Sequence, residues 1–237
     1  MFNSTVRLQR CLPVLATSVV LLTGCGVAGT DFNPGIAAEV GDDTLTTKHV
    51  DTVTHDYCAA LETVTKGQPS AAGQPAMPMR YFSHDFVSEL ITRSAAEQLA
   101  DDHGVEPSGA YKTDLAQLEP QLVDLTEAQR DAVVEVIGAR AYSQDVLTVI
   151  GGEALAEDGN DDATDEDKLA AGEEVLDEWV ADHDVEINPK YGLEYGTPTQ
   201  VDTDLSYALG TTAKAGLQPE PDSDYADSLP AHLVCLD

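Results

Sequence analysis

Apolar residues recur at helical spacing along most of the chain, and this periodicity constrains the fold more than any other feature. Between residues 48 and 65 they form one stripe, which is typical of an amphipathic helix packed on a core: Val50, Val53, Tyr57, Ala60, Leu61 and Val64. Similar stripes predict four further helices, over residues 80–103, over 108–122, from Thr126 to the pair Gly151-Gly152, and over 165–182.

Three short strand-like segments border this helical region. Residues 36–40 and 44–46 flank a turn signal at residues 41–43, which predicts a hairpin, and residues 185–187 are a third strand. Because a two-stranded ribbon alone is marginally stable, we expect the third strand to return to the hairpin. The predicted fold is therefore mainly α: an antiparallel helical domain with a small β element, formed by an N-terminal hairpin and a returning C-terminal strand.

The first 25 residues have the features of an export signal. Two arginines precede an apolar run of 11 residues at positions 12–22, whereas a membrane-spanning helix needs about 20. The run ends in Leu22-Thr23-Gly24-Cys25, which resembles the lipobox of bacterial lipoproteins. This resemblance implies that Cys25 becomes the lipidated N-terminus and anchors the protein on the extracytoplasmic face of the cell membrane. The alternatives are an ordinary signal peptide with a chance cysteine, or a short buried helix.

Composition divides the chain into four expected segments. These are a lipoprotein signal peptide at 1–24, a lipid-anchored tether at 25–35, the helical domain at 36–192, and a tail at 193–237 that is rich in Pro, Gly, Thr and Asp and is expected to be irregular. Within the helical domain, the proline-containing segment 67–79 is interpreted as a linker.

Two cysteines remain once Cys11 leaves with the signal and Cys25 carries lipid. An even number of cysteines in an exported protein favours a disulfide, here between Cys58 and Cys235. This bond would tie the tail to the first helix; the alternative is two separate buried thiols. Neither cysteine has a second Cys or His at ligand spacing beside it, so no metal site is expected there.

The formal net charge is −31, from 43 Asp and Glu against 12 Lys and Arg. A chain this acidic lacks the basic clusters that bind nucleic acid or an anionic membrane surface. It also carries no phosphate-binding loop, zinc-protease motif or serine-hydrolase elbow. We therefore expect no nucleic-acid, nucleotide or cofactor binding, and attachment to the membrane through the N-terminal lipid alone.

The strand pair at residues 37–46, the helices that follow, and the returning segment 185–192 together resemble the N-terminal domain of SurA/PrsA-type chaperones, especially its lipid-anchored members. The resemblance covers residues 36–192. It implies a chaperone-like protein that binds unfolded or extended polypeptide segments. The parvulin prolyl-isomerase domain of the full chaperones, which needs about 100 residues, has no match here, so the resemblance implies no enzymatic activity.

Four aromatic residues are the candidates for contacting such clients at the edge of an apolar groove: Tyr57, Tyr81, Phe82 and Phe86. The alternative function is a structural or interaction lipoprotein that binds one specific partner in the cell envelope.

A third hypothesis is a metal-dependent hydrolase that uses His-Asp pairs, which occur at His55-Asp56, His84-Asp85 and His183-Asp184. That hypothesis requires the pairs to converge in space. The acidic segment 157–167 has calcium-loop spacing at Asp158, but it lacks the glycine and the final glutamate of an EF-hand, so a solvated loop is the default interpretation.

Overall fold

The computed structural model describes residues 34–66, 76–196, 210–216, 218 and 223–236. The expected signal peptide, Cys25 with its expected lipidation, and most of the expected tether lie outside these ranges. No helix in the described ranges is both long enough and apolar enough to cross a membrane.

The predicted mainly-α fold with a small β element is confirmed. Strands β1 (Ile36–Val40) and β2 (Asp43–Thr46) form the hairpin, and β4 (Val185–Ile187) pairs antiparallel with β1, so the sheet order is β2-β1-β4. The turn between β1 and β2 contains Gly41 at a positive φ of 53°, a conformation that favours glycine. The two ends of the helical domain therefore meet in one sheet.

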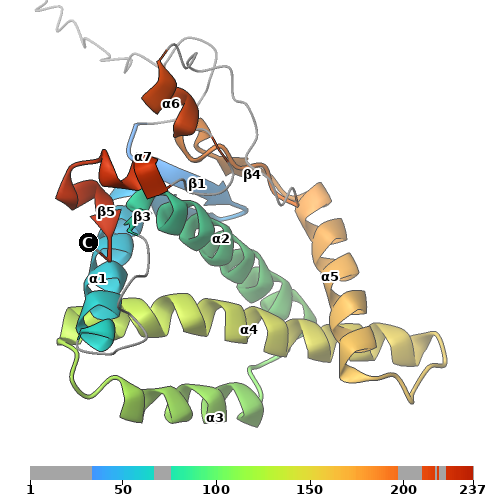
Figure 1. The fold of residues 1–237 in the computed structure, drawn as a ribbon. Coiled ribbons are helices and arrows are strands. Elements are labelled where there is room, and N and C mark those ends of the chain that lie inside the picture. The colour runs from blue at the N-terminus through green and yellow to red at the C-terminus, as the bar shows by residue number, and fades with distance from the viewer. Residues whose placement is uncertain (1–33, 67–75, 197–209, 217, 219–222, 237) are drawn as a thin grey trace, which may run out of the picture. The chain divides into compact units, whose positions relative to one another are not determined.

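Five main helices follow the predicted order (Figure 1): α1 (Thr47–Thr65), α2 (Met79–His103), α3 (Gly109–Leu118), α4 (Glu127–Glu157) and α5 (Asp165–Asp182). Side-chain caps explain where four of them begin, because the hydroxyls of Thr46, Ser108, Thr126 and Thr164 each accept a backbone N–H from the first turn. The 3₁₀ turn η1 (Glu119–Gln121), which contains Pro120, follows α3.

The main core lies where β1, α1, α2, α4 and α5 meet. Its fully buried side chains include Val40, Val50, Val87, Ile91, Val146 and Ile150. Trp179 on α5 belongs to this core, stacks on His183 with 3.8 Å between ring centroids, and donates its indole N–H to Asp102 on α2. The core is mainly aliphatic, with Tyr142, Trp179 and Tyr191 as its aromatic members.

Helix α4 does not weaken at Gly151-Gly152, as the sequence suggested, but continues to Glu157. The helix continues because of how α4 packs on α5. A methyl group on Gly151 would lie 1.9 Å from the carbonyl oxygen of Lys168, and one on Gly172 would lie 2.0 Å from that of Leu147. These glycines therefore allow the backbones of α4 and α5 to touch, and the contact outweighs the poor helix propensity of glycine.

The tail segment 193–237, expected to be irregular, carries defined elements within its described part. These are the 3₁₀ turn η3 (Ala231–Leu233), strand β5 (Val234–Cys235), and the helices α6 (Thr211–Ala215) and α7 (Ser223–Asp227). Strand β5 pairs antiparallel with β3 (Met77–Pro78), which falls in the expected linker, and lies beside α1 in Figure 1. Cys58 and Cys235 form a disulfide, with 5.6 Å between their Cα atoms.

Candidate functional site

A groove of about 660 Å³ lies between α2, α4, α5 and the chain that leaves β4. We call it the acidic groove. Its apolar lining combines buried core residues with partly exposed ones: Ile91, Leu147, Leu169, Leu176, Ile187, Leu193 and Tyr195. The apolar stripe of α5 supplies one wall, and the residues that follow β4 supply the opposite one.

Carboxylates dominate the charged lining of this groove. Glu173 and Asp177 stand one turn apart on α5, and Glu194 follows β4. None of these three takes part in an ion pair with another described residue. The groove's single described cation, Arg140, is paired with Glu89, and the hydrogen bond to that carboxylate raises the pKa of its guanidinium. The groove is therefore apolar along its length and negative at its edge.

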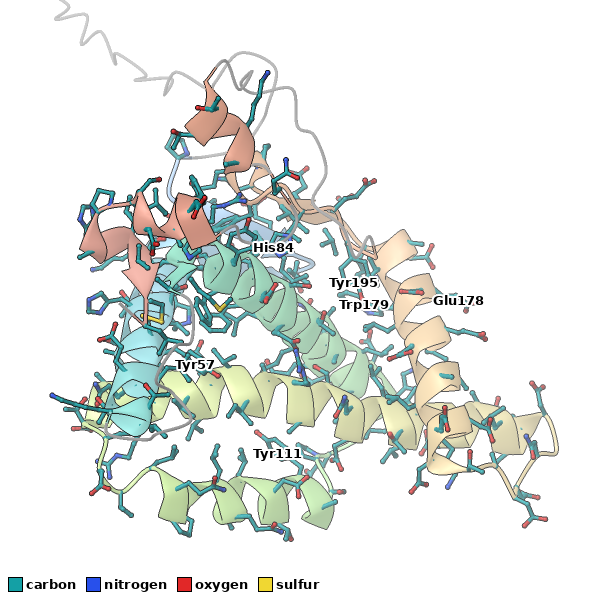
Figure 2. All side chains as sticks on the ribbon, viewed as in Figure 1. Tyr57, His84, Tyr111, Glu178, Trp179 and Tyr195 are labelled. Atoms are coloured by element: carbon teal, nitrogen blue, oxygen red, sulfur yellow. A yellow bond between two sulfur atoms is a disulfide. The ribbon has the colours of Figure 1, made fainter. Side chains whose placement is uncertain are left out.

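The pKa of Tyr195 is also affected by the negative charge at the edge of the groove. Burial raises the pKa of its hydroxyl to about 12, and the nearby Asp177 and Glu173 carboxylates add to this effect. Figure 2 shows Tyr195 and Trp179 on the side of α5 that faces α2, whereas Glu178 lies on the outer side. The negative charges of α5 thus divide into a groove-facing pair and an outward-facing group.

Three of the four predicted peptide-contacting aromatics pack on one another. The ring centroid of Tyr57, on α1, lies 4.8 Å from that of Phe86 and 6.4 Å from that of Phe82, both on α2. Phe86 is 5% exposed, and the cluster is completed by Val53 and two α4 residues, Ala132 and Val136. These rings stabilise the helix junction and do not line the acidic groove. Their role in peptide binding stays a prediction.

The sequence analysis did not identify the residues that line the acidic groove. Leu169 and Leu176 belong to the predicted stripe of α5, yet periodicity does not say which stripe residues meet a hollow. Leu193 and Tyr195 fall in the segment expected to be irregular. The spacing of Glu173 and Asp177, which places both carboxylates on one helix face, was the signal that could have been used.

A second cavity, of about 640 Å³, is lined by α1, the start of α2, the 3₁₀ turn η2 (Pro189–Tyr191) and η3. We call it the basic pocket. Five basic residues line it: His55, Arg80, His84, Lys190 and His232. Tyr81, the fourth predicted aromatic, also lines it and donates its hydroxyl hydrogen to the carbonyl oxygen of Gln218.

The structure brings two of the three His-Asp pairs to one cavity and leaves the third apart. His55 and His84 line the basic pocket, but each contacts the aspartate next to it, at 3.4 and 3.2 Å. His183 lies at the end of α5 and contacts the carbonyl oxygen of Trp179. In the described residues, no group of three potential metal ligands includes any of these histidines. The geometry therefore gives no support to the hydrolase hypothesis.

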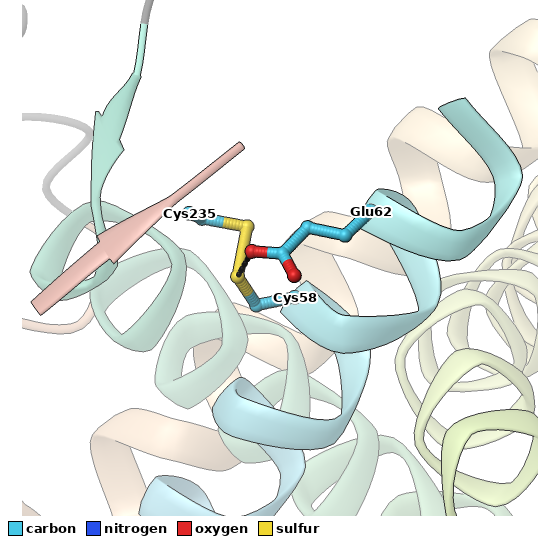
Figure 3. Close-up of side chains that lie close together, drawn as sticks. All are labelled: Cys58, Glu62 and Cys235. Carbon is cyan, nitrogen blue, oxygen red and sulfur yellow. Dashed lines mark hydrogen bonds between the residues drawn. A yellow bond between two sulfur atoms is a disulfide. The ribbon is translucent and has the colours of Figure 1, made fainter. Parts of the chain in front are cut away.

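One group of potential ligands does occur in the described ranges: Cys58, Glu62 and Cys235, shown in Figure 3. The two sulfur atoms are bonded to each other, and the Glu62 carboxylate lies 3.8 Å from the Cys58 sulfur. A disulfide sulfur lacks the thiolate charge that binds metals. This group is therefore a structural cross-link.

The acidic segment 157–167 also has a structural role. Asp167 accepts hydrogen bonds from the backbone and hydroxyl of Thr164, which lowers the pKa of its carboxyl group, and Asp165 pairs with Lys168. These contacts begin α5 and place its negative charges at the positive end of the helix dipole.

Comparison of the chain with protein-family models, with curated proteins and with solved structures found no match.

Proposed function

We propose that this protein is a lipid-anchored, extracytoplasmic, chaperone-like protein that binds unfolded or extended polypeptide segments without catalysing a reaction on them. The observation that carries the proposal is the acidic groove, with its apolar lining and its unpaired carboxylates at Glu173, Asp177 and Glu194. The resemblance of residues 36–192 to chaperone N-terminal domains supports the same function.

The apolar lining favours side chains of the kind that folded proteins bury. Leu169, Ile187 and Leu193 are only partly buried, so a client's aliphatic or aromatic side chains would remove them from water. A volume of about 660 Å³ accommodates a few such side chains and no folded domain. An extended segment fits this hollow better than a folded surface does.

The carboxylates add selectivity for charge. Glu173 and Asp177 are exposed on the groove side of α5, where they attract lysine or arginine residues that flank an apolar segment and repel acidic ones. The net charge of −31 acts in the same direction over longer distances and keeps the protein itself soluble. We therefore expect clients that are apolar with basic flanks.

Charge reversal on two faces of α5 tests the proposal. The purified protein is titrated with a fluorescently labelled, unstructured peptide that has a Leu- and Phe-rich centre and lysine flanks. We expect saturable binding, weakened about tenfold by Glu173→Lys with Asp177→Lys. The matched control, Glu174→Lys with Glu178→Lys, changes the same charge on the same helix outside the groove lining and is expected to leave the affinity unchanged.

Two further measurements complete the test. A peptide with glutamate flanks is expected to bind more weakly than the lysine-flanked one, and the protein is expected to slow aggregation of an unfolded client at stoichiometric amounts. Circular dichroism confirms that each variant is folded. Absence of peptide binding by the wild type, or equal loss in both pairs of variants, would overturn the proposal.

A further inference from the structure

We infer that the basic pocket is a second binding site, which takes a small amphipathic anion with a carboxylate or phosphate group attached to an apolar body. The inference stands on the pocket's own residues and is independent of the acidic groove. It has three supports: the local charge, three unsatisfied polar atoms, and the start of α2.

The local charge is opposite to that of the chain as a whole. Five basic residues line the pocket in a protein that has only 12 Lys and Arg and six His against 43 acidic residues. Two carboxylates face them, Asp51 and Asp85; Asp51 lies 3.7 Å from Lys190, and Asp85 contacts His84. Arg80 has no acidic partner among the described residues. Basic residues therefore outnumber carboxylates in this lining by five to two.

Three buried polar atoms in the described ranges have no hydrogen-bond partner: Arg80 Nε, His84 Nε2 and the Tyr191 hydroxyl. All three belong to residues that line the basic pocket, and Tyr191 is only 6% exposed. A buried polar group without a partner lowers stability, so three of them around one cavity favour a ligand that supplies oxygen atoms.

The chemistry of these atoms suits an oxyanion. Arg80 uses Nη2 to donate to Tyr81 and to the Gln218 carbonyl oxygen, which leaves its Nε–H free for a ligand. His84 Nδ1 contacts Asp85, and its Nε2 is the ring nitrogen left without a partner. The Arg80 Nε–H and the Tyr191 hydroxyl are donors that match the lone pairs of a carboxylate or phosphate.

The first turn of α2 adds a further source of positive potential. Met79, Arg80 and Tyr81 form this turn and line the pocket. The turn contains no acidic residue, and the residue before it, Pro78, makes no side-chain cap. Among the described residues, no side-chain cap and no first-turn carboxylate neutralises the positive end of the dipole of this 25-residue helix. An anion in the pocket would neutralise it.

The rest of the lining selects an apolar body. Met79 and Leu233 contribute aliphatic surface, and the Tyr81 and Tyr191 rings contribute aromatic surface. A cavity of about 640 Å³ matches a small organic molecule. Leu233 and His232 come from the tail and are held there by the disulfide through the adjacent Cys235. The pocket is thus complete only when the tail is docked.

The probe is 4-phenylbutyrate, and its neutral amide, 4-phenylbutanamide, is the matched control ligand. Calorimetric titration of the wild type is expected to show saturable binding of the acid and at least tenfold weaker binding of the amide. Phenyl phosphate distinguishes a preference for phosphate from one for carboxylate. Backbone NMR shifts on binding are expected at residues 79–85 and 190–191.

Tyr191→Phe is the decisive variant. It removes one unpartnered hydroxyl and keeps the buried ring, so stability should be unchanged or raised while affinity for the acid falls several-fold. Arg80→Gln is expected to weaken binding further, and Glu173→Lys with Asp177→Lys to leave it unchanged. Equal binding of acid and amide, or unchanged affinity in Tyr191→Phe, would overturn the inference whatever the outcome at the acidic groove.

Discussion

Gly151 of α4 and Gly172 of α5 lie in backbone contact: a methyl group on Gly151 would come within 2.3 Å of the Gly172 nitrogen. The contact brings the two helix axes close enough for the stripe of α5 to pack against α4. It also sets the angle at which α5 forms one wall of the acidic groove. Gly151, where the sequence suggested that a helix ends, and Gly172, within the predicted helix 165–182, therefore position the candidate site.

We expect Gly151→Ala and Gly172→Ala each to lower the free energy of unfolding by about 1–3 kcal/mol, because the added methyl group meets backbone atoms that cannot move independently. Urea unfolding followed by Trp179 fluorescence measures the change.

Gly152→Ala is the matched control for these two variants. A methyl group at this position meets only the flexible side chain of Lys168, at 3.3 Å, so the better helix propensity of alanine is expected to leave the protein as stable or more stable. Equal destabilisation by all three substitutions would contradict the packing argument.

Replacing both Cys58 and Cys235 by alanine is expected to destabilise the protein by up to about 5 kcal/mol, since the bond closes a loop with a sequence separation of 177 residues. The same variant is expected to lose amide-exchange protection at Val234, where β5 pairs with β3. Peptide mapping without reductant provides the direct check, and two free thiols in the purified protein would contradict the pairing.

Helices α4 and α5 each begin with a capping box, in which the side chains of the N-cap threonine and of the residue three positions later each bind the other's backbone N–H. The two boxes predict different responses to acid. Thr164 donates to Asp167, whose pKa is lowered by these bonds; this stabilisation is complete above the unfolded carboxyl value near 4 and is lost as pH falls through the folded one. The difference in melting temperature between wild type and Thr164→Ala should therefore shrink between pH about 7 and about 3.

Thr126→Ala is the control for this pH dependence, because its box partner, Gln129, does not ionise. Its effect is expected to be the same at both pH values. A Thr164→Ala effect that is equally independent of pH would show that the Asp167 carboxylate contributes nothing to the cap.

Cys25→Ser is expected to abolish fatty-acid labelling and to move the protein out of the membrane fraction, since the lipid is the proposed anchor. Cys11→Ser, within the same leader, is the matched control and should leave both unchanged. Membrane association that persists in Cys25→Ser would contradict the lipobox interpretation.

Much of the fold could be predicted from local sequence patterns. The predicted helix over 165–182 has the observed bounds, and the predicted strands over 36–40 and 185–187 do as well. Caps, turns and apolar periodicity act within a few residues, so a sequence window contains all the information they need.

The candidate sites could not be predicted from the sequence in the same way. Tyr57, Phe82 and Phe86 were predicted to contact clients because they are aromatic, but in the structure they pack on one another at a helix junction. The acidic groove and the basic pocket both combine residues from elements far apart in the chain, so no window of sequence contains either of them.

The sequence by itself determined the five main helices and the strands β1, β2 and β4, because those choices depend on neighbours along the chain; the short elements of the tail and β3 were not predicted. Only the tertiary structure decided that α4 continues past Gly151, because the reason is the contact with Gly172. It also decided that His232 joins His84 in one pocket. Such contacts depend on how close two backbones come and on which side chains remain without a partner, and both are properties of the packed chain.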